Sequence, residues 1–216
     1  MPKEDFSHVA TWVFDLDNTL YPPSARLFDQ IEAQMTRYVM EALKIDQITA
    51  DHLRDHYWHT YGTTLAGLMR EHDVDPGPYL DQVHDIDLGH LQKDPNLKAR
   101  ISALPGRKVI YTNGPSIHAE RVTAARGLSG IFDAVYGVEH AGFLPKPERA
   151  AFDTVFAIDH IVPETSAMFE DDHRNLQAPH AMGMKCVLVG PARNEKAAHI
   201  HHQTDDLAHF LSQIIG

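Results

Sequence analysis

The chain has 216 residues, of which 43% are hydrophobic, and a formal net charge of -11. The length favours one domain that carries a sizeable insertion, and the hydrophobic content is sufficient for a packed core, which excludes global disorder. The acidic balance argues against nucleic acid or an anionic membrane as a partner, because both require a basic surface.

The single cysteine, Cys186, lies in an apolar run and cannot form an internal disulfide, which suits a reducing compartment. Residues 1–8 contain no apolar segment typical of a secretion signal, and no stretch is long and apolar enough to span a bilayer. These features predict a cytoplasmic protein without a membrane partner. They give no indication of the oligomeric state.

The first predicted strand is the apolar run Trp12–Phe14, which leads directly into Asp15 and Asp17, with Thr19 two residues later. The aspartates therefore follow the carboxyl end of a buried strand, which is where open parallel sheets bind ligands. Two neighbouring carboxylates repel each other unless a cation lies between them, and a hard divalent cation is the usual solution. Asp and Asn are also common turn residues, so this stretch alone leaves a turn and a metal site equally open.

Residues 21–100 predict helices and no strand. Thr49 is expected to cap a helix that ends at Gly62, and Asp94 with Pro95 is typical of a helix start. The expected helices start near Leu27 and Thr49, and cover Thr64–His72, Pro78–Val83 and Asp94–Leu104.

After this helical block, short apolar strands alternate with helices. The expected strands are Lys108–Tyr111, Ala134–Tyr136, Ala167–Phe169 and Lys185–Val189, the last being the final core strand; the expected helices are Ser116–Arg126 with Ser116 as its cap, Pro147–Phe156, Asn175–Met182 and Leu207–Ile214. Such alternation predicts a parallel sheet covered on both faces. We therefore expect an α/β, Rossmann-like core formed by residues 1–20 and 101–216, with an inserted helical unit at 21–100.

Polar clusters stand where four of the predicted strands end. They are Asp15/Asp17/Thr19, Thr112/Asn113, Lys146, and Glu170/Asp171/Asp172. Each cluster alone has an ordinary explanation as a turn, a solvated loop charge or a helix N-terminus. The carboxyl ends of parallel strands share one edge, however, so the four clusters are expected to converge.

The converged set has the chemistry required for phosphoryl transfer. Carboxylates from two strand ends can hold Mg²⁺, which binds phosphate oxygens, and a hydroxyl, an amide and a lysine can contact the phosphoryl group. An aspartate can act as the nucleophile through an aspartyl-phosphate. A second carboxylic acid can protonate the leaving alkoxide and later activate the attacking water.

These residues, in this order, resemble the motifs of the haloacid dehalogenase (HAD) superfamily of phosphotransferases. The resemblance implies that Asp15 is the nucleophile and Asp17 the general acid/base, and that phosphate esters are the substrates, since members that act on halides or phosphonates lack the second aspartate. By the same resemblance, Thr112 and Asn113 bind the phosphate, Lys146 steadies the phosphoryl group, and Mg²⁺ is held by Asp15, the Asp17 carbonyl and Asp171. Asp172 and Asn175 are expected to support the metal site, with orientation of Lys146 or capping of the following helix as the alternatives for Asp172. Glu170, where many relatives have glycine, either binds a metal-bound water or has no catalytic part, and it is left out of the expected site.

The helical block matches the position of the mobile cap found in this superfamily. The run Phe14–Ser24 and the cap segment Tyr57–Leu65 resemble the pyrimidine 5′-nucleotidase-like branch, which implies UMP and CMP as substrates. Tyr61 and Thr63, with Thr64, are the candidates for contact with the substrate beyond its phosphate, although a helix end with ordinary packing explains them nearly as well. His199–His202 follow no zinc-ligand spacing and are interpreted as a surface segment.

Other functions share parts of this pattern. A phosphomutase, or a phosphatase of other small metabolites, would have the same core motifs. A phosphorylatable signalling receiver also uses an acidic cluster, a threonine and a lysine, but the helical insertion and Asp17 argue against it. A Mg²⁺-binding regulatory module without activity is a further alternative, which the intact motifs make less favourable.

Overall fold

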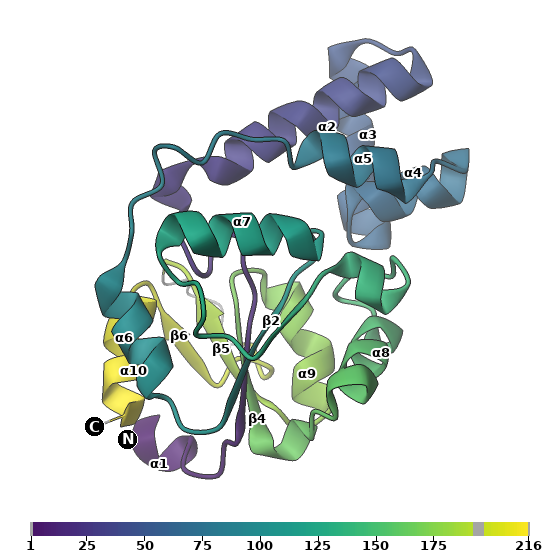
Figure 1. Ribbon diagram of the computed structural model, residues 1–216. Helices are drawn as coiled ribbons and strands as arrows, with labels where there is room; N and C mark the ends of the chain where they lie inside the picture. Colours follow the sequence, from purple (N-terminus) through teal and green to yellow (C-terminus); the bar gives the residue numbers. More distant parts are fainter. Residues whose placement is uncertain (1, 192–196, 216) are drawn as a thin grey trace.

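A six-stranded parallel sheet forms the centre of the computed structural model, which describes residues 2–191 and 197–215. The strands lie in the order β3-β2-β1-β4-β5-β6, and each neighbouring pair is parallel. Their bounds are β1 Thr11–Phe14, β2 Arg107–Tyr111, β3 Ala134–Tyr136, β4 Ser166–Glu170, β5 Lys185–Val189 and β6 His202–Thr204. This order is that of Rossmann folds, so the predicted α/β core is confirmed (Figure 1).

Helices account for most of the remaining described chain. The α-helices are α1 Pro2–Asp5, α2 Leu27–Leu43, α3 Gln47–Tyr61, α4 Thr64–His72, α5 Pro76–Val83, α6 Pro95–Ala103, α7 Ser116–Arg126, α8 Arg149–Asp159, α9 Gln177–Ala181 and α10 Leu207–Ile215. The 3₁₀ helices are η1 Pro23–Ala25, η2 Val138–Ala141, η3 Pro163–Thr165 and η4 His173–Leu176. As predicted, the described chain between residues 21 and 100 is helical and contains no strand.

Strand β1 shows how the sheet is buried on both faces. Trp12 and Phe14 pack into one core cluster with α6, α7 and α10, whereas Val13 packs into a second cluster with α8 and α9. Successive side chains of a strand point to opposite faces, so an unbroken apolar run is required here. Phe14 stacks on Phe169 of the neighbouring strand at a centroid distance of 4.8 Å. Each such aromatic side chain contributes about 1.5–3 kcal/mol by burial.

The sheet has one strand more than the sequence predicts. Strand β6 pairs in parallel with β5, so the prediction that Lys185–Val189 is the final strand was wrong. The new strand is His202–Thr204, polar and only three residues long, and it carries none of the apolar alternation that identifies a half-buried strand. Part of the predicted surface segment His199–His202 is thus an edge strand, and the imidazole of His201 accepts a hydrogen bond from the Cys186 backbone N–H at 3.0 Å.

Two predicted helix caps were also wrong. Helix α3 begins one turn earlier than expected, because Asp46 is its N-cap and accepts a hydrogen bond from the backbone N–H of Thr49. Ser116 is the first residue of α7 rather than its cap, and its N–H donates to the Glu139 carboxylate instead. A carboxylate satisfies a free N–H at a helix start and is favoured there by the helix dipole.

Helices α2–α5 form the unit that stands where a cap is expected. Figure 1 shows them together at one end of the molecule, joined to the core by the start of α2 and by the segment after α5. Their apolar side chains form a cluster of their own, to which Val138 of η2 also belongs. Helix α6 instead packs on α10 and contributes Leu97 and Ile101 to the main core. We therefore propose that the cap ends near Val83, before the expected boundary at residue 100.

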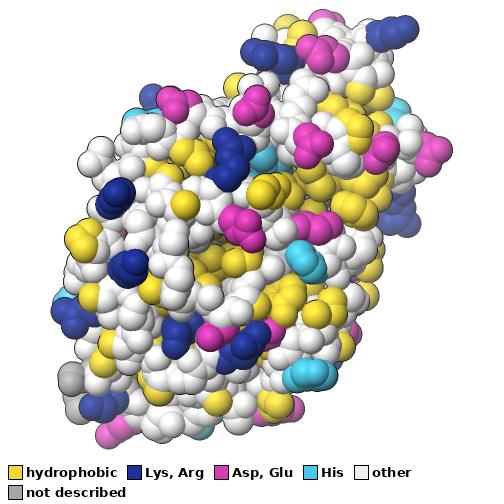
Figure 2. Space-filling view, viewed as in Figure 1, with side chains coloured by type: hydrophobic (Ala, Val, Ile, Leu, Met, Phe, Trp, Pro, Cys, Tyr) yellow, Lys and Arg dark blue, Asp and Glu magenta, His cyan; other side chains and the backbone are white. Residues whose placement is uncertain are grey.

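The surface agrees with the acidic composition. On the face shown in Figure 2, Lys and Arg side chains of the described residues stand apart from one another among acidic and apolar ones. Of the helices in the described part of the chain, none has the length and apolar content needed to cross a membrane.

Candidate active site

The first acidic motif occupies the point where the sheet order reverses. Asp15 directly follows β1, and its N–H continues the ladder to β4 by donating to the Phe169 carbonyl at 2.9 Å. The chain then turns sharply, with Asn18 at a φ of 59° and the Leu20 N–H donating back to the Leu16 carbonyl. Asparagine tolerates this left-handed conformation better than most residues. The switch point between β1 and β4 is where ligands bind in such sheets.

Lys146 is the centre of a buried ion-pair cluster at this edge. Its Nζ donates to Asp15 Oδ1 at 2.7 Å, to Glu170 Oε2 at 2.7 Å and to the Tyr111 carbonyl at 3.0 Å. The side chain of Lys146 is 1% exposed. Burial opposes its charge, but Asp15 and Glu170 outweigh that cost and raise the pKa of Lys146, so the ammonium stays protonated.

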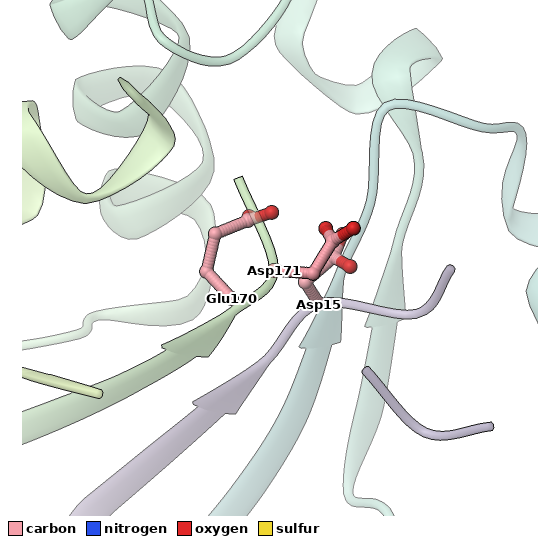
Figure 3. A group of neighbouring side chains, drawn as sticks. All are labelled: Asp15, Glu170 and Asp171. Carbon is pink, nitrogen blue, oxygen red and sulfur yellow. The ribbon is translucent and has the colours of Figure 1, made fainter. Parts of the chain in front are cut away.

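The acidic residues of the same cluster outnumber the lysine. Asp15, Glu170 and Asp171 each present a carboxylate oxygen, and these oxygens lie within 4.8 Å of one another (Figure 3). Burial raises the pKa of Asp15 to about 8, and Glu170 adds to this effect. Burial and the negative charge of Glu170 likewise raise the pKa of Asp171 well above its usual range.

This geometry and charge fit a divalent cation. Ligands at ~2.1 Å from one Mg²⁺ are roughly 3–4 Å apart, and the three oxygens lie within 4.8 Å of one another. Neighbouring carboxylates raise the pKa of one another, and a cation bound between them favours their ionised form. Glu170, which was left out of the expected site, belongs to the same group of carboxylates as Asp15 and Asp171 and also binds Lys146.

Asp17 lies in a separate environment. Its Oδ1 accepts a hydrogen bond from the Tyr21 hydroxyl at 2.6 Å and one from His118 Nε2 at 3.4 Å. Burial opposes ionisation of Asp17, but these two donors outweigh it and lower the pKa of the carboxyl. The ring of His84 lies 4.6 Å from that of His118. Sequence analysis did not identify the histidines of this group, because His84 and His118 lie far from Asp17 along the chain.

Thr112 and Asn113, which follow β2, have different roles. Thr112 is buried, lines the cavity, and its hydroxyl oxygen accepts from the Gly114 N–H at 3.0 Å. Asn113, which was expected to bind the phosphate, uses both ends of its amide on the backbone of Lys146: Nδ2 donates to the carbonyl at 3.1 Å and Oδ1 accepts from the N–H at 2.8 Å. Asn113 therefore holds the lysine loop in place.

The acidic loop after β4 is tied to the cap. Arg174 binds the Asp172 carboxylate through Nε and Nη2, at 3.0 and 2.6 Å. The same guanidinium lies over the Trp58 ring at 3.4 Å from its centroid and donates to the Trp58 carbonyl at 3.1 Å. Burial opposes the charge on Asp172, but Arg174 lowers its pKa. Asn175 lines the same cavity, and its Oδ1 is buried without a hydrogen bond in the described chain.

A second contact joins the cap to the lysine loop. Gly62 ends α3 at a φ of 88°, and a Cβ placed there would meet the Lys146 carbonyl at 3.2 Å and Pro147 at 3.0 Å. Both the positive φ and the close approach require glycine.

Core and cap together enclose a cavity of about 560 Å³. Thr63 lines it, although its hydroxyl caps α4 by accepting from the Ala66 N–H at 3.2 Å. Tyr61 does not belong to the lining, and its hydroxyl donates to Glu71. The structure thus brings Asp15, Asp17, Thr112, Asn113, Lys146, Asp171, Asp172, Asn175 and Thr63 to one cavity, and leaves Tyr61 outside it.

Comparison with known proteins identifies the family. The chain matches the model of the haloacid dehalogenase-like hydrolases over residues 9–183. The chain belongs to this family. This HAD hydrolase is 25% identical over 191 residues to Phosphate metabolism protein 8 of Saccharomyces cerevisiae, an alignment that covers 81% of the chain and 60% of the yeast protein. The alignment therefore covers less than two thirds of the length of the yeast protein.

Solved structures share the fold. CbbY from Rhodobacter sphaeroides, in complex with phosphate, superposes with a TM-score of 0.64 at 18% identity and covers 93% of this HAD hydrolase and 95% of CbbY. The HAD-hydrolase YfnB from Bacillus subtilis, bound to magnesium, gives 0.62 at 16% identity and covers 95% and 98% of the two chains. At these identities the likeness establishes the fold, and the family predicted from the motifs is confirmed.

Proposed function

We propose that the protein is a Mg²⁺-dependent phosphomonoesterase that acts through an aspartyl-phosphate, with the pyrimidine nucleotides UMP and CMP as its substrates. The observation that carries the proposal is the division of the two aspartates between two environments. Asp15 lies in a cluster with Lys146 and two further carboxylates, whereas Asp17 faces the hydrogen-bond donors Tyr21 and His118. Carboxyl groups whose surroundings differ in this way can perform different steps of one reaction.

The first step follows from these positions. A carboxylate oxygen of Asp15 attacks phosphorus, and the bond between phosphorus and the ester oxygen breaks. Asp17 gives its proton to the departing oxygen, because an alkoxide is a poor leaving group. Asp17 obtains that proton as substrate binds, since the negative phosphoryl group raises the pKa of a neighbouring carboxyl. Lys146 offsets the repulsion between the anionic nucleophile and the anionic substrate.

The second step regenerates the enzyme. Asp17, now a carboxylate, takes a proton from water as the water oxygen attacks phosphorus. The bond between phosphorus and the Asp15 oxygen breaks, inorganic phosphate leaves, and the Asp15 carboxylate is restored. Thr112 lines the same cavity and donates its hydroxyl proton to a phosphoryl oxygen, while Asn113 keeps Lys146 in place.

Mg²⁺, held by Asp15, Asp171 and Glu170 with the Asp17 carbonyl that the family resemblance adds, would supply positive charge beside the phosphoryl oxygens. The fit of these oxygens to a cation supports this cofactor. Small phosphorylated substrates are supported by the relatives, because CbbY is solved with phosphate and with xylulose-(1,5)bisphosphate. A buried thiol at Cys186 suits the proposed cytoplasmic location.

A substrate panel tests the proposal. Nucleoside monophosphates and sugar phosphates are assayed for release of inorganic phosphate, with Mg²⁺ and with EDTA, using the parent protein and Asp15→Asn. We expect UMP and CMP among the best substrates, complete dependence on Mg²⁺, and a loss on the order of 10⁴-fold or more in Asp15→Asn, as for other nucleophiles. An Asp15→Asn protein that is folded and as active as its parent would contradict the assignment.

A further inference from the structure

The cap end of the cavity contains a buried hydroxyl group without a well-formed hydrogen bond in the described part of the chain. Tyr79, on α5, lines the cavity and is 2% exposed. Among the described residues no acceptor or donor completes a well-formed hydrogen bond with its hydroxyl, and the Thr64 side chain is the neighbouring hydrogen-bonding group that partly offsets the rise of its pKa on burial. The ring packs edge-on against Tyr38 at a centroid distance of 5.0 Å, which fixes its position. A buried hydroxyl without a partner costs about 1–3 kcal/mol, and native structures contain few such groups.

Arg54 supplies a second unused donor on the same cavity wall. Its Nη1 donates to Thr36 at 2.7 Å, and its Nη2 lies 3.4 Å from Glu32. The Nε–H is buried and has no acceptor among the described residues. Arg54 also lines the cavity. It is close to Tyr79, since its charge partly offsets the burial that raises the pKa of that hydroxyl.

Acidic side chains surround this arginine. Glu32, Asp51 and Asp55 line the cap side of the cavity, and Arg54 is the one basic residue of the described lining there. The guanidinium is already balanced, by Asp51 at 3.5 Å as well as by Glu32. An anionic group entering this end would meet net negative charge in a partly desolvated space, where like charges repel strongly.

Apolar side chains form much of the remaining lining of the cap end, beside Thr63 and Thr64. Phe28, Ile31, Leu65 and Leu80 contribute to it. Such walls favour a flat or apolar body, while the few polar groups fix its orientation.

We propose that Tyr79 and Arg54 form the subsite that recognises the leaving group, and that this subsite takes an uncharged group with a hydrogen-bond acceptor oxygen and rejects a second phosphate. The proposal rests on the proposed phosphatase function. The subsite distinguishes a phosphatase from a phosphomutase, which the core motifs alone do not do. A phosphomutase that passes through a bisphosphate would have to place its second phosphate beside Glu32 and Asp51, so the cap favours the hydrolase.

The test compares Tyr79→Phe with the parent protein on two monoesters. UMP carries carbonyl acceptors on its leaving group, whereas phenyl phosphate carries none. The substitution preserves the packing against Tyr38 and removes only the hydroxyl. We expect kcat/KM for UMP to fall about tenfold, as the loss of one hydrogen bond to a substrate in a buried site predicts, with phenyl phosphate hydrolysis unchanged. Tyr38→Phe is the matched control, because Tyr38 does not line the cavity.

A third substrate tests whether the subsite rejects a second negatively charged group. We expect the parent to hydrolyse uridine 3′,5′-bisphosphate at least about tenfold less efficiently than UMP at its 5′ position, because the extra phosphate brings charge toward the acidic wall. Equal efficiencies, or an equal effect of Tyr79→Phe on UMP and phenyl phosphate, would overturn the subsite while leaving the phosphatase intact. If the parent releases no phosphate from any of the three compounds, the phosphatase proposal fails and the subsite fails with it.

Discussion

The proposed reacting groups at the core end of the cavity are held by hydrogen bonds and ion pairs, although the neighbouring Asn175 Oδ1 has no partner in the described chain, and two groups at the cap end are less well satisfied. At the core edge, Lys146 binds Asp15 and Glu170, and Asp17 accepts from Tyr21. At the cap end, the hydroxyl of Tyr79 and the Nε–H of Arg54 have no partner in the described chain. Groups that perform a reaction must be held in position before substrate arrives, whereas groups that select a leaving group are satisfied by the substrate itself. Under the proposed function, this contrast separates the reacting groups from the groups that select the substrate within one cavity.

The fold explains this separation. The core residues stand at the ends of hydrogen-bonded parallel strands, whose register fixes them relative to one another. The cap is a separate helical cluster that meets the core through a few contacts, such as Gly62 on the Lys146 loop and Trp58 under Arg174. Changes on the core side are therefore expected to affect every substrate, and changes in the cap only some.

The largest effect beyond the nucleophile is expected at Asp17. Asp17→Asn removes the proposed proton donor and acceptor, and we expect hydrolysis of alkyl phosphates such as UMP to fall about 10²–10⁴-fold. Phenyl phosphate should lose less in its first step, since a phenolate leaves more readily than an alkoxide. Steady-state and burst measurements of both substrates check this. Equal losses in the first step would remove the general-acid role and weaken the division of labour between the aspartates.

Glu170 is expected to have an intermediate effect. Glu170→Gln replaces one carboxylate of the cluster formed by Asp15, Glu170 and Asp171 with a neutral amide. It also removes one of the negative charges that Lys146 contacts. We expect about 10–100-fold more Mg²⁺ to be needed for half-maximal activity, as for other changes at metal-site carboxylates, with a smaller loss at saturating Mg²⁺. A titration of activity against Mg²⁺ measures both quantities. An unchanged requirement for Mg²⁺ would restrict Glu170 to holding the lysine.

The smallest effect on activity is expected far from the cavity, at Asp159. This residue accepts hydrogen bonds from Arg107 at 2.5 and 2.8 Å and from the Tyr136 hydroxyl at 2.5 Å. We expect Asp159→Asn to lower the free energy of unfolding by about 1–2 kcal/mol and to leave kcat/KM unchanged. Asp153→Asn on the same helix removes only an exposed pair with Arg149, and its effect should be below about 0.5 kcal/mol.

The contribution of Asp159 has a defined pH dependence. Burial opposes its ionisation, but Arg107 and Tyr136 outweigh this and lower the pKa of the carboxyl. A carboxyl whose pKa is lower in the folded than in the unfolded protein adds stability above the unfolded pKa, and this is lost as pH falls through the folded value. Denaturant unfolding of parent and Asp159→Asn should therefore differ near pH 7 and converge at acidic pH. A constant difference across this range would contradict the assignment.

The sequence predicted those parts of the fold that are encoded by local pattern. The runs that became β1, β2 and β4 are apolar because both faces of the sheet are covered, and that requirement is visible in the residues themselves. Strand β6 was missed because an edge strand needs only backbone pairing, and its polar residues show no pattern. The start of α3 was predictable from Asp46, which lies three residues before Thr49. Aspartate is at least as common at the N-cap as threonine.

The sequence allowed prediction of which residues form the site, but not of all the hydrogen bonds between them. Parallel topology alone implies that Asp15, Lys146 and Asp171 meet at one edge. The bond from Lys146 to Glu170 depends on the path of the lysine loop, which the amide of Asn113 holds from 33 positions away. The donors around Asp17 include His118, 101 positions distant. Such contacts arise from three-dimensional packing and leave no periodic trace in the chain.

The pairing of Trp58 with Arg174 also gives the protein a natural fluorophore at the boundary between its two parts. The chain has two tryptophans; Trp12 is buried in the core with its Nε1 donating to the Pro105 carbonyl at 2.6 Å, while Trp58 lies partly exposed beneath the guanidinium. Any separation of α3 from the loop after β4 would release that ring into water and change its emission. With Trp12 replaced by phenylalanine, the remaining indole would follow cap movement in real time without any attached dye.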